Sequence, residues 1–180
     1  MLLPNQLTVL RIILTPIFIV LFLSNDPLLI QISLGVFLAA ALTDWYDGWL
    51  ARKFNYITEW GKFMDPLADK ILTSTAFFGF VSLGILEFWM VLVIVFRDFL
   101  VTLLRAYADY RKVSFTTSNL AKWKTFFQMF FLYYLLIIYT LRTVPSLNQS
   151  YTSLFASLLN QELIFWIMLA VTLFTLITSI

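Results

Sequence analysis

The sequence predicts an all-α integral membrane protein built as a bundle of six transmembrane helices. Of its 180 residues, 61% are hydrophobic and 12% are charged, and the mean hydropathy is +0.89, which indicates a bilayer environment. Apolar runs of about 18 or more residues recur along the chain, each long enough to cross about 30 Å of hydrocarbon as a helix. A helix also satisfies its own backbone polar groups inside a membrane, so these runs favour a helical bundle.

Six spans account for the apolar runs. They are expected at residues 7–23, 29–50, 63–83, 88–107, 123–141 and 163–180. Polar and turn-forming residues separate the spans, and none of these stretches is longer than an ordinary connecting loop. We therefore expect residues 1–180 to form one membrane domain. The first run continues for a full span and leads directly into another, so we do not expect a cleavable signal.

The basic residues predict the orientation of the bundle. If the N-terminus is cytoplasmic, ten of the twelve lysines and arginines fall toward the inner face, while Arg142 lies outside and Arg97 lies deep in the membrane. The positive-inside rule then places both termini in the cytoplasm. We expect a multi-pass protein of the cell membrane, that is, an inner or plasma membrane.

Chemistry in this chain has few side chains available to it. The sequence contains no histidine and no cysteine, which excludes imidazole bases, thiolate nucleophiles and thiolate metal sites. Carboxylates, lysines, tyrosines and metal-bound water remain as groups that can transfer a proton.

Four aspartates gather around the predicted loop between the second and third spans. Asp44 and Asp47 are three residues apart, and Asp65 and Asp69 are four apart, so each pair shares one helix face. Four carboxylates in a partly desolvated site repel one another unless cations neutralise them. Oxygen ligands favour Mg²⁺ or Mn²⁺, and two pairs can hold two ions about 3.5–4 Å apart. Pro66 is expected in the first turn of the third helix, which places Asp65 at the helix start.

A simpler interpretation of the same acids is a set of salt bridges near the loop. The available partners are Arg52, Lys53, Lys62 and Lys70. Acids in membrane helices cost about 2.5–3.5 kcal/mol each on insertion scales, so four of them at helical spacing favour the metal site.

The spacing of these residues resembles a known family. The pattern Asp44-x2-Asp47-Gly48-x2-Ala51-Arg52-x8-Gly61-x3-Asp65-x3-Asp69 matches the signature of the CDP-alcohol phosphotransferases. The resemblance implies a six-helix fold of that type and a metal-dependent enzyme, usually a homodimer. Such an enzyme cleaves a CDP-linked substrate, releases CMP and transfers the remaining phosphoryl moiety to an alcohol.

The resemblance also implies roles for the matching residues. The metal ligands would be Asp44, Asp47, Asp65 and Asp69, of which Asp69 would also be the catalytic base for the acceptor hydroxyl. The CDP-binding residues would be Gly48, Ala51, Arg52 and Gly61. These positions put the active site at the cytoplasmic face, where the acyl chains of a lipid substrate remain in the bilayer.

Further segments resemble the branch of the family that uses glycerol 3-phosphate as acceptor. They are residues 4–11, 43–53, 61–73, 97–106 and 121–125. This implies a reaction of CDP-diacylglycerol with glycerol 3-phosphate that gives phosphatidylglycerophosphate and CMP, a step of phosphatidylglycerol biosynthesis. A phosphorylated acceptor needs a cationic pocket. The expected phosphate-binding residues are Arg105, Arg111, Lys122 and Lys124, with Lys112 beside them. The same cations are also explained by topology and by attraction to anionic lipid.

Arg97 and Asp98 allow two interpretations. Asp98, Thr102, Arg105 and Asp109 form one helical stripe, whereas Arg97 points about 100° away and is not expected to pair simply with its neighbour. Charges at this depth rarely face lipid, so the stripe lines a cavity or pairs with another helix.

Several alternatives remain open for the function. The same reaction can use another acceptor: serine, an inositol phosphate, or phosphatidylglycerol as in cardiolipin synthesis. Outside the enzymes, a small cation transporter would bind cations in transit at buried acids, and a structural membrane subunit would leave the signature unexplained. The clustering of the acids near one interface favours the enzyme. Membrane lipid is an expected partner, and nucleic acid is not.

Overall fold

The computed structural model describes residues 3–54, 59–111 and 119–178, and these ranges consist of helices joined by short turns, with no strand. Seven helices lie in this part of the chain: α1 Leu3–Phe22, α2 Pro27–Phe54, α3 Glu59–Ser82, α4 Phe88–Tyr110, α5 Asn119–Arg142, α6 Pro145–Leu158 and α7 Gln161–Ile177. Side chains are described along these helices except at 3–5, 44–45, 47–52, 54, 59–60, 62–63, 109–110, 119 and 121. The prediction of an all-α protein is confirmed for the described residues.

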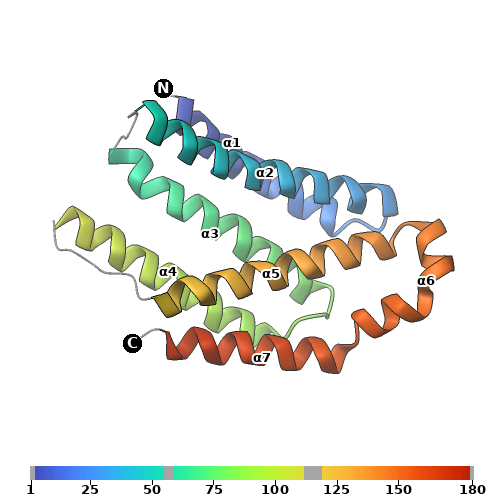
Figure 1. Cartoon of the computed structure of the whole chain (residues 1–180). Coiled ribbons are helices and arrows are strands. Elements are labelled where there is room, and N and C mark those ends of the chain that lie inside the picture. The colour runs from blue at the N-terminus through green and yellow to red at the C-terminus, as the bar shows by residue number, and fades with distance from the viewer. Residues whose placement is uncertain (1–2, 55–58, 112–118, 179–180) are drawn as a thin grey trace.

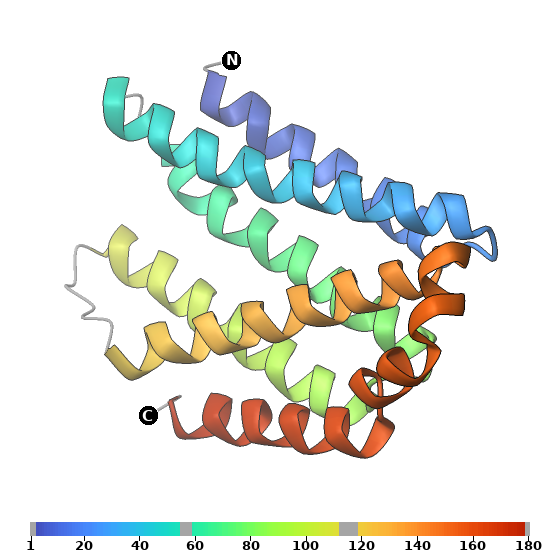
Figure 2. The ribbon, with the colours of Figure 1, turned by 45° about the vertical axis from the view of Figure 1, so that its right-hand side comes forward.

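Six of these helices correspond to the predicted spans, and they run back and forth between the two ends of the molecule (Figure 1). α1 and α2 form an antiparallel pair, α3 packs on α1, α4 packs on α3, and α7 packs on α4. α5 crosses α3 and contacts α2, α3 and α7. The beginning of α1 and the end of α7 lie at the same end of the bundle in both views (Figure 2). Which side of a membrane this end faces remains a prediction.

By length and hydropathy alone, one stretch of the described residues is suited to cross a membrane, Lys122–Arg142 in α5. α6 and α7 together form a second candidate that is bent by 47°. Gln6–Phe22 and Pro27–Thr43 are shorter apolar helices. The count of six membrane spans therefore stays a prediction, although six long helices are present in the expected places.

The structure adds one helix and moves the start of another. Residues 143–160 were expected as a break between two spans, and most of them form α6, which begins with Pro145 and bends at Tyr151. A hydropathy pattern overlooks this helix because it is short and polar, with Phe155 as its buried residue. α3 begins at Glu59, so Pro66 lies inside the helix and Asp65 lies in its second turn.

The turns explain why the helices end where they do. Gly84 has a φ of 70°, and the bonds from Gly84 N to Val81 O and from Ile85 N to Phe80 O close α3 in a Schellman motif. At the start of α7, the Asn160 side chain accepts a hydrogen bond from Glu162 N at 2.9 Å.

An aromatic core holds the half of the bundle opposite the chain termini. Phe18 and Phe22 of α1 are completely buried and contact Phe37 of α2, Phe80 of α3 and Tyr139 of α5. Gly79 lets α1 approach α3, because a Cβ there would lie 2.9 Å from the side chain of Ile19. These ring contacts bring α1, α2, α3 and α5 together at this end of the bundle.

Candidate active site

Asp65 and Asp69 lie one turn apart on the first half of α3. The Thr8 hydroxyl of α1 donates a hydrogen bond of 2.5 Å to Asp65 Oδ1, so the first helix helps to orient this carboxylate. Arg11, one turn further along α1, is completely buried. Gly61 is also buried, one turn before Asp65. The N-terminal helix therefore forms one wall of the region that carries the predicted acids.

Asp69 is partly exposed and only loosely paired. The distance from its Oδ2 to the amino group of Lys70 is 3.7 Å, and the exposed fractions of the two side chains are 29% and 17%. This contact gives partial support to the salt-bridge interpretation at one of the four acids. A partly exposed carboxylate in a long ion pair keeps oxygen lone pairs for another ligand.

Most of the other predicted acid and CDP-binding residues lie where only the helix backbone is described. Five of them belong to the last part of α2, and the structure does not describe their side chains: Asp44, Asp47, Gly48, Ala51 and Arg52. Among the side chains that are described, no three acids gather as a metal site would require. Asp65 and Asp69 by themselves fit a hard divalent cation, because their donor atoms are carboxylate oxygens.

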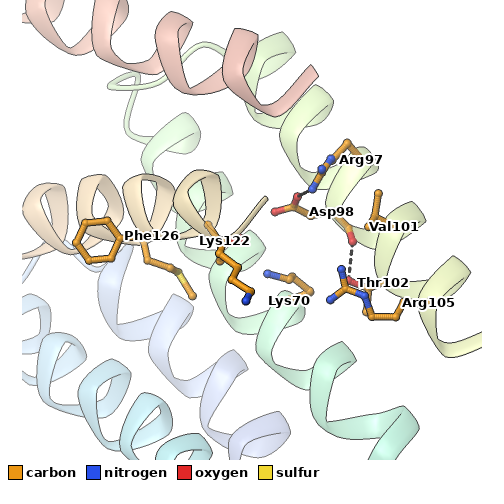
Figure 3. A pocket seen from close by; sticks show the side chains of 10 residues that line it. Lys70, Arg97, Asp98, Val101, Thr102, Arg105, Lys122 and Phe126 are labelled. Carbon is orange, nitrogen blue, oxygen red and sulfur yellow. Dashed lines mark hydrogen bonds and ion pairs between the residues drawn. The ribbon is translucent and has the colours of Figure 1, made fainter. Parts of the chain in front are cut away.

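A pocket with a volume of about 550 Å³ opens beside Lys70. Its lining residues come from α3, α4 and α5: Lys70, Arg97, Asp98, Val101, Thr102, Arg105, Lys122, Thr125, Phe126 and Met129. In Figure 3 the amino groups of Lys70 and Lys122 and the guanidinium of Arg105 face the same space. Four cations and one acid among the described lining residues make this pocket suited to an anion with more than one negative charge.

Asp98, the acid in the pocket wall, is almost completely engaged. It is buried, and its Oδ1 accepts hydrogen bonds from the amino group of Lys124 and from Arg97 Nη1, the latter at 3.2 Å. Its Oδ2 accepts a hydrogen bond of 3.1 Å from Gln128 Nε2. Lys124 and Gln128 belong to α5, so this carboxylate joins α4 to α5.

The polar stripe on α4 both lines a cavity and pairs with another helix, so each of the two interpretations is confirmed in part. Asp98, Thr102 and Arg105 line the pocket together, and Asp98 also pairs with another helix. The expectation that Arg97 would not pair with its neighbour is wrong, because the long arginine side chain bends back to Asp98. Its Nη2 also donates a hydrogen bond of 2.7 Å to the backbone oxygen of Thr178 at the end of α7.

The structure divides the predicted phosphate-binding residues into two groups. Arg105 and Lys122 line the pocket, while Arg111 and Lys124 are not among its lining residues. The Nε of Arg111 donates a hydrogen bond of 3.0 Å to the Tyr107 hydroxyl on the surface. Lys124 is 1% exposed and bound to Asp98, so we assign it to the scaffold of the pocket rather than to its ligands. Lys112 lies outside the described residues.

Sequence reasoning missed three residues of this region. Lys70 and Arg97 line the pocket, and Thr8 binds Asp65, yet none of them was predicted as a site residue. Signals were present: Lys70 directly follows Asp69, and Thr8 belongs to the segment 4–11 that supports the family resemblance. Only the packing of α1 against α3 and of α4 against α3 brings these residues to the site.

Comparison with known proteins gives a consistent result. Residues 1–178 match the sequence model of the family described as CDP-alcohol phosphatidyltransferase. A protein of Rickettsia bellii named CDP-diacylglycerol--glycerol-3-phosphate 3-phosphatidyltransferase is 41% identical over 128 residues, 71% of each chain. A Bacillus subtilis protein of the same name is 42% identical over 115 residues, which cover 57% of this chain and 60% of the relative. A probable phosphatidylglycerophosphate synthase of Mycobacterium tuberculosis is 36% identical over 129 residues, 70% of this chain and 61% of the relative.

Proposed function

This chain belongs to the CDP-alcohol phosphatidyltransferase family, and from that premise we propose that it transfers the phosphatidyl group of CDP-diacylglycerol to glycerol 3-phosphate. The products are phosphatidylglycerophosphate and CMP, and the step belongs to phosphatidylglycerol biosynthesis. The names of the relatives from Rickettsia bellii and Bacillus subtilis support this acceptor.

The cationic pocket is the structural observation that carries the proposal. Glycerol 3-phosphate brings a phosphate monoester, which serine, a zwitterion, does not have. Lys70, Arg105 and Lys122 face one space, and a guanidinium can bind two phosphate oxygens at once. The acceptor phosphate binds in this pocket, and its glycerol part extends toward α3.

Lys70 connects the pocket to the acids. Its amino group lines the pocket and lies 3.7 Å from Asp69 Oδ2. An acceptor that binds Lys70 through its phosphate therefore brings its hydroxyl groups toward Asp69. This arrangement supports the role of Asp69 as the base, since a base must come within about 3 Å of the proton that it removes.

The transfer forms one phosphorus–oxygen bond and breaks another. One of the two hydroxyl oxygens of glycerol 3-phosphate attacks the phosphorus that carries the diacylglycerol group, and the bond from this phosphorus to the oxygen shared with CMP breaks. CMP leaves with that oxygen, and Asp69 accepts the hydroxyl proton. The cationic pocket holds the acceptor so that only one of its hydroxyl groups reaches the phosphorus.

Divalent ions fit this chemistry. Asp44, Asp47, Asp65 and Asp69 would hold Mg²⁺ or Mn²⁺, two ions in all, through carboxylate oxygens alone. Bound there, the ions would neutralise the negative charge of the pyrophosphate. Gly48, Ala51, Arg52 and Gly61 would bind the CDP part, as the family signature implies. Thr8 would orient Asp65 from the side of α1.

The family is membrane-associated. Beyond that, we propose a homodimer in the cell membrane, with one multi-pass domain over residues 1–180 and the active site at the cytoplasmic face. The first half of α3, which carries the two acids, and the second half of α4, which carries Arg105, lie toward the end of the bundle that contains both chain ends (Figure 1). This placement supports a site at a membrane interface.

The test measures CMP release by purified protein in detergent. Each reaction contains CDP-diacylglycerol, Mg²⁺ or Mn²⁺, and one acceptor: glycerol 3-phosphate, serine, an inositol phosphate or phosphatidylglycerol. We expect CMP only with glycerol 3-phosphate, and none when EDTA replaces the metal. Release with another acceptor alone would contradict the proposed acceptor. No release with any of them would contradict the enzyme and favour a non-catalytic cation-binding protein.

A further inference from the structure

The buried carboxylate of Asp98 lies in the wall of the cationic pocket, and its hydrogen bonds join two of the helices that form the pocket, α4 and α5. Arg97 and Arg105 belong to α4, and Lys122 belongs to α5. Few charged side chains in the described part of the chain are as completely enclosed as Asp98 and Lys124, at 5% and 1% exposure. Burying two charges is costly, so a position that keeps them calls for an explanation.

The two carboxylate oxygens of Asp98 accept hydrogen bonds from different side chains. Oδ1 accepts from Lys124 on α5 and from Arg97 on its own helix, while Oδ2 accepts from Gln128 on α5. Lys124 and Gln128 are one turn apart, so the carboxylate is fixed against one face of α5 at two points. The rotation of α4 about its axis is thereby set relative to α5.

Rotation of α4 decides where Arg105 points. Arg105 follows Asp98 by seven residues, two turns along the same face, with Thr102 between them. On α5, Lys122 precedes Lys124 by two residues. The Asp98–Lys124 pair therefore joins the two helices that carry Arg105 and Lys122, the cations that line the pocket from α4 and α5.

Arg97 extends the same arrangement to a third helix. One end of its guanidinium binds Asp98, and Nη2 donates a hydrogen bond of 2.7 Å to Thr178 O at the C-terminal end of α7. A cation at a helix C-terminus is also favoured by the helix dipole. α4, α5 and α7 meet through one carboxylate and one guanidinium.

We propose that Asp98 is a positioning residue for the acceptor site. With Lys124, Gln128 and Arg97, it holds the cations of the pocket at the spacing that a phosphate monoester requires. The inference rests on the proposed function for the identity of the acceptor. It goes beyond that function by assigning the buried pair a role in acceptor affinity and not only in folding.

Two simpler roles give different results. If Asp98 acted only through its charge, Asp98→Asn would make the pocket more positive and lower the KM for glycerol 3-phosphate. If the pair acted only in folding, variants that fold would keep both KM values. A positioning role raises the KM for glycerol 3-phosphate and leaves the KM for CDP-diacylglycerol unchanged.

The main test uses the double variant Asp98→Asn/Lys124→Met. It removes one negative and one positive charge, so the net charge of the site is unchanged and neither member of the Asp98–Lys124 pair is left without the other, while Arg97 keeps its hydrogen bond to Thr178 O. We expect the KM for glycerol 3-phosphate to rise about tenfold, as for the loss of about one charged hydrogen bond, with a change below about twofold in the KM for CDP-diacylglycerol. An unchanged KM for glycerol 3-phosphate in folded protein would overturn the proposal, as would an equal rise in both constants.

A milder variant keeps the test valid if the double variant does not fold. Gln128→Met removes the bond to Oδ2 but leaves both charges paired, and we expect a rise of about threefold in the same KM. A wild-type constant here would overturn the proposal as well. Turnover by the wild type separates the two proposals. If wild-type protein releases no CMP with glycerol 3-phosphate, the proposed acceptor is contradicted. If the wild type is active and the variants keep its KM values, only the positioning role is contradicted.

Discussion

Aspartates occur in two regions of this protein that look alike in the sequence and differ in the structure. Asp65 and Asp69 on α3, and Asp98 on α4, all lie on long apolar helices. Asp98 is 5% exposed and accepts hydrogen bonds from three side chains on two helices. Asp69 is 29% exposed, and its ion pair with Lys70 spans 3.7 Å. Burial and bonding separate an aspartate that holds helices together from one that is available to a substrate.

The cations show the same contrast. Lys122 and Lys124 are two residues apart on α5, but Lys122 is exposed at the pocket and Lys124 is buried against Asp98. Two nearby lysines on one helix therefore have different roles: Lys122 is available to a ligand in the pocket, and Lys124 stabilises the packing of α5 against α4. Substitutions on the two sides of this division should affect different measurements, activity on one side and stability on the other.

The largest effect is expected at Asp69. Asp69→Asn removes the proposed base without changing the size of the side chain, and CMP release should fall by about a hundredfold to ten-thousandfold. Circular dichroism and thermal unfolding in detergent should remain as in the wild type. Asp26→Asn is the matched control, because Asp26 caps α2 through the backbone nitrogen of Leu28, and asparagine caps equally well. Wild-type turnover by Asp69→Asn would exclude it as the base.

The next largest effect concerns stability. Lys124→Met leaves the buried charge of Asp98 without its main partner and should lower the free energy of unfolding by about 3–5 kcal/mol. Lys122→Met, two residues away, should change it by less than about 0.5 kcal/mol because the side chain is exposed. Thermal unfolding in the same detergent compares the two. Equal loss of stability in both variants would contradict the assignment of Lys124 to the support of the pocket and of Lys122 to the binding of its ligand.

The sequence predicted the helices well because apolar length is a local property. Six long helices lie at the six predicted spans, and only α6 was missed, since its polar composition and 14 residues do not resemble a span. The start of α3 was placed too late because Pro66 was taken as a first-turn residue, whereas the helix accommodates it internally. Local sequence rules predict where a helix occurs, but they do not predict whether that helix contains a proline in its interior, as α3 contains Pro66.

The candidate site was only partly predictable for a related reason. Spacing identified Asp65 and Asp69, which lie on one helix and share a face. It did not identify Thr8 or Lys70, whose contacts depend on how α1 and α4 pack against α3. Cationic residues near an interface all look alike in sequence, so Arg105 and Arg111 were predicted together although only Arg105 lines the pocket.

Arg105 and Arg111 now provide a direct comparison for the acceptor. Arg105→Ala should raise the KM for glycerol 3-phosphate about tenfold, or about 1.4 kcal/mol, with little change for CDP-diacylglycerol. Arg111→Ala removes a surface contact with Tyr107 and should change neither constant by more than about twofold. Steady-state kinetics with each substrate varied in turn checks both. A larger effect at Arg111 would indicate that Arg111 binds the acceptor, and it would contradict the assignment of the acceptor site to the pocket beside Lys70.

The smallest effect is expected at the wall formed by α1. Thr8→Val keeps the shape of the side chain but removes the donor to Asp65 Oδ1, so the carboxylate loses one of the contacts that orient it. We expect the Mg²⁺ or Mn²⁺ concentration for half-maximal CMP release to rise about fivefold, as for one hydrogen bond. Thr15→Val is the control, because the Thr15 hydroxyl donates only to Arg11 O within the same helix, at 2.9 Å. If both variants keep the wild-type metal requirement, α1 contributes packing alone; if only Thr8→Val shifts it, Asp65 belongs with the available carboxylates and α1 belongs to the active site.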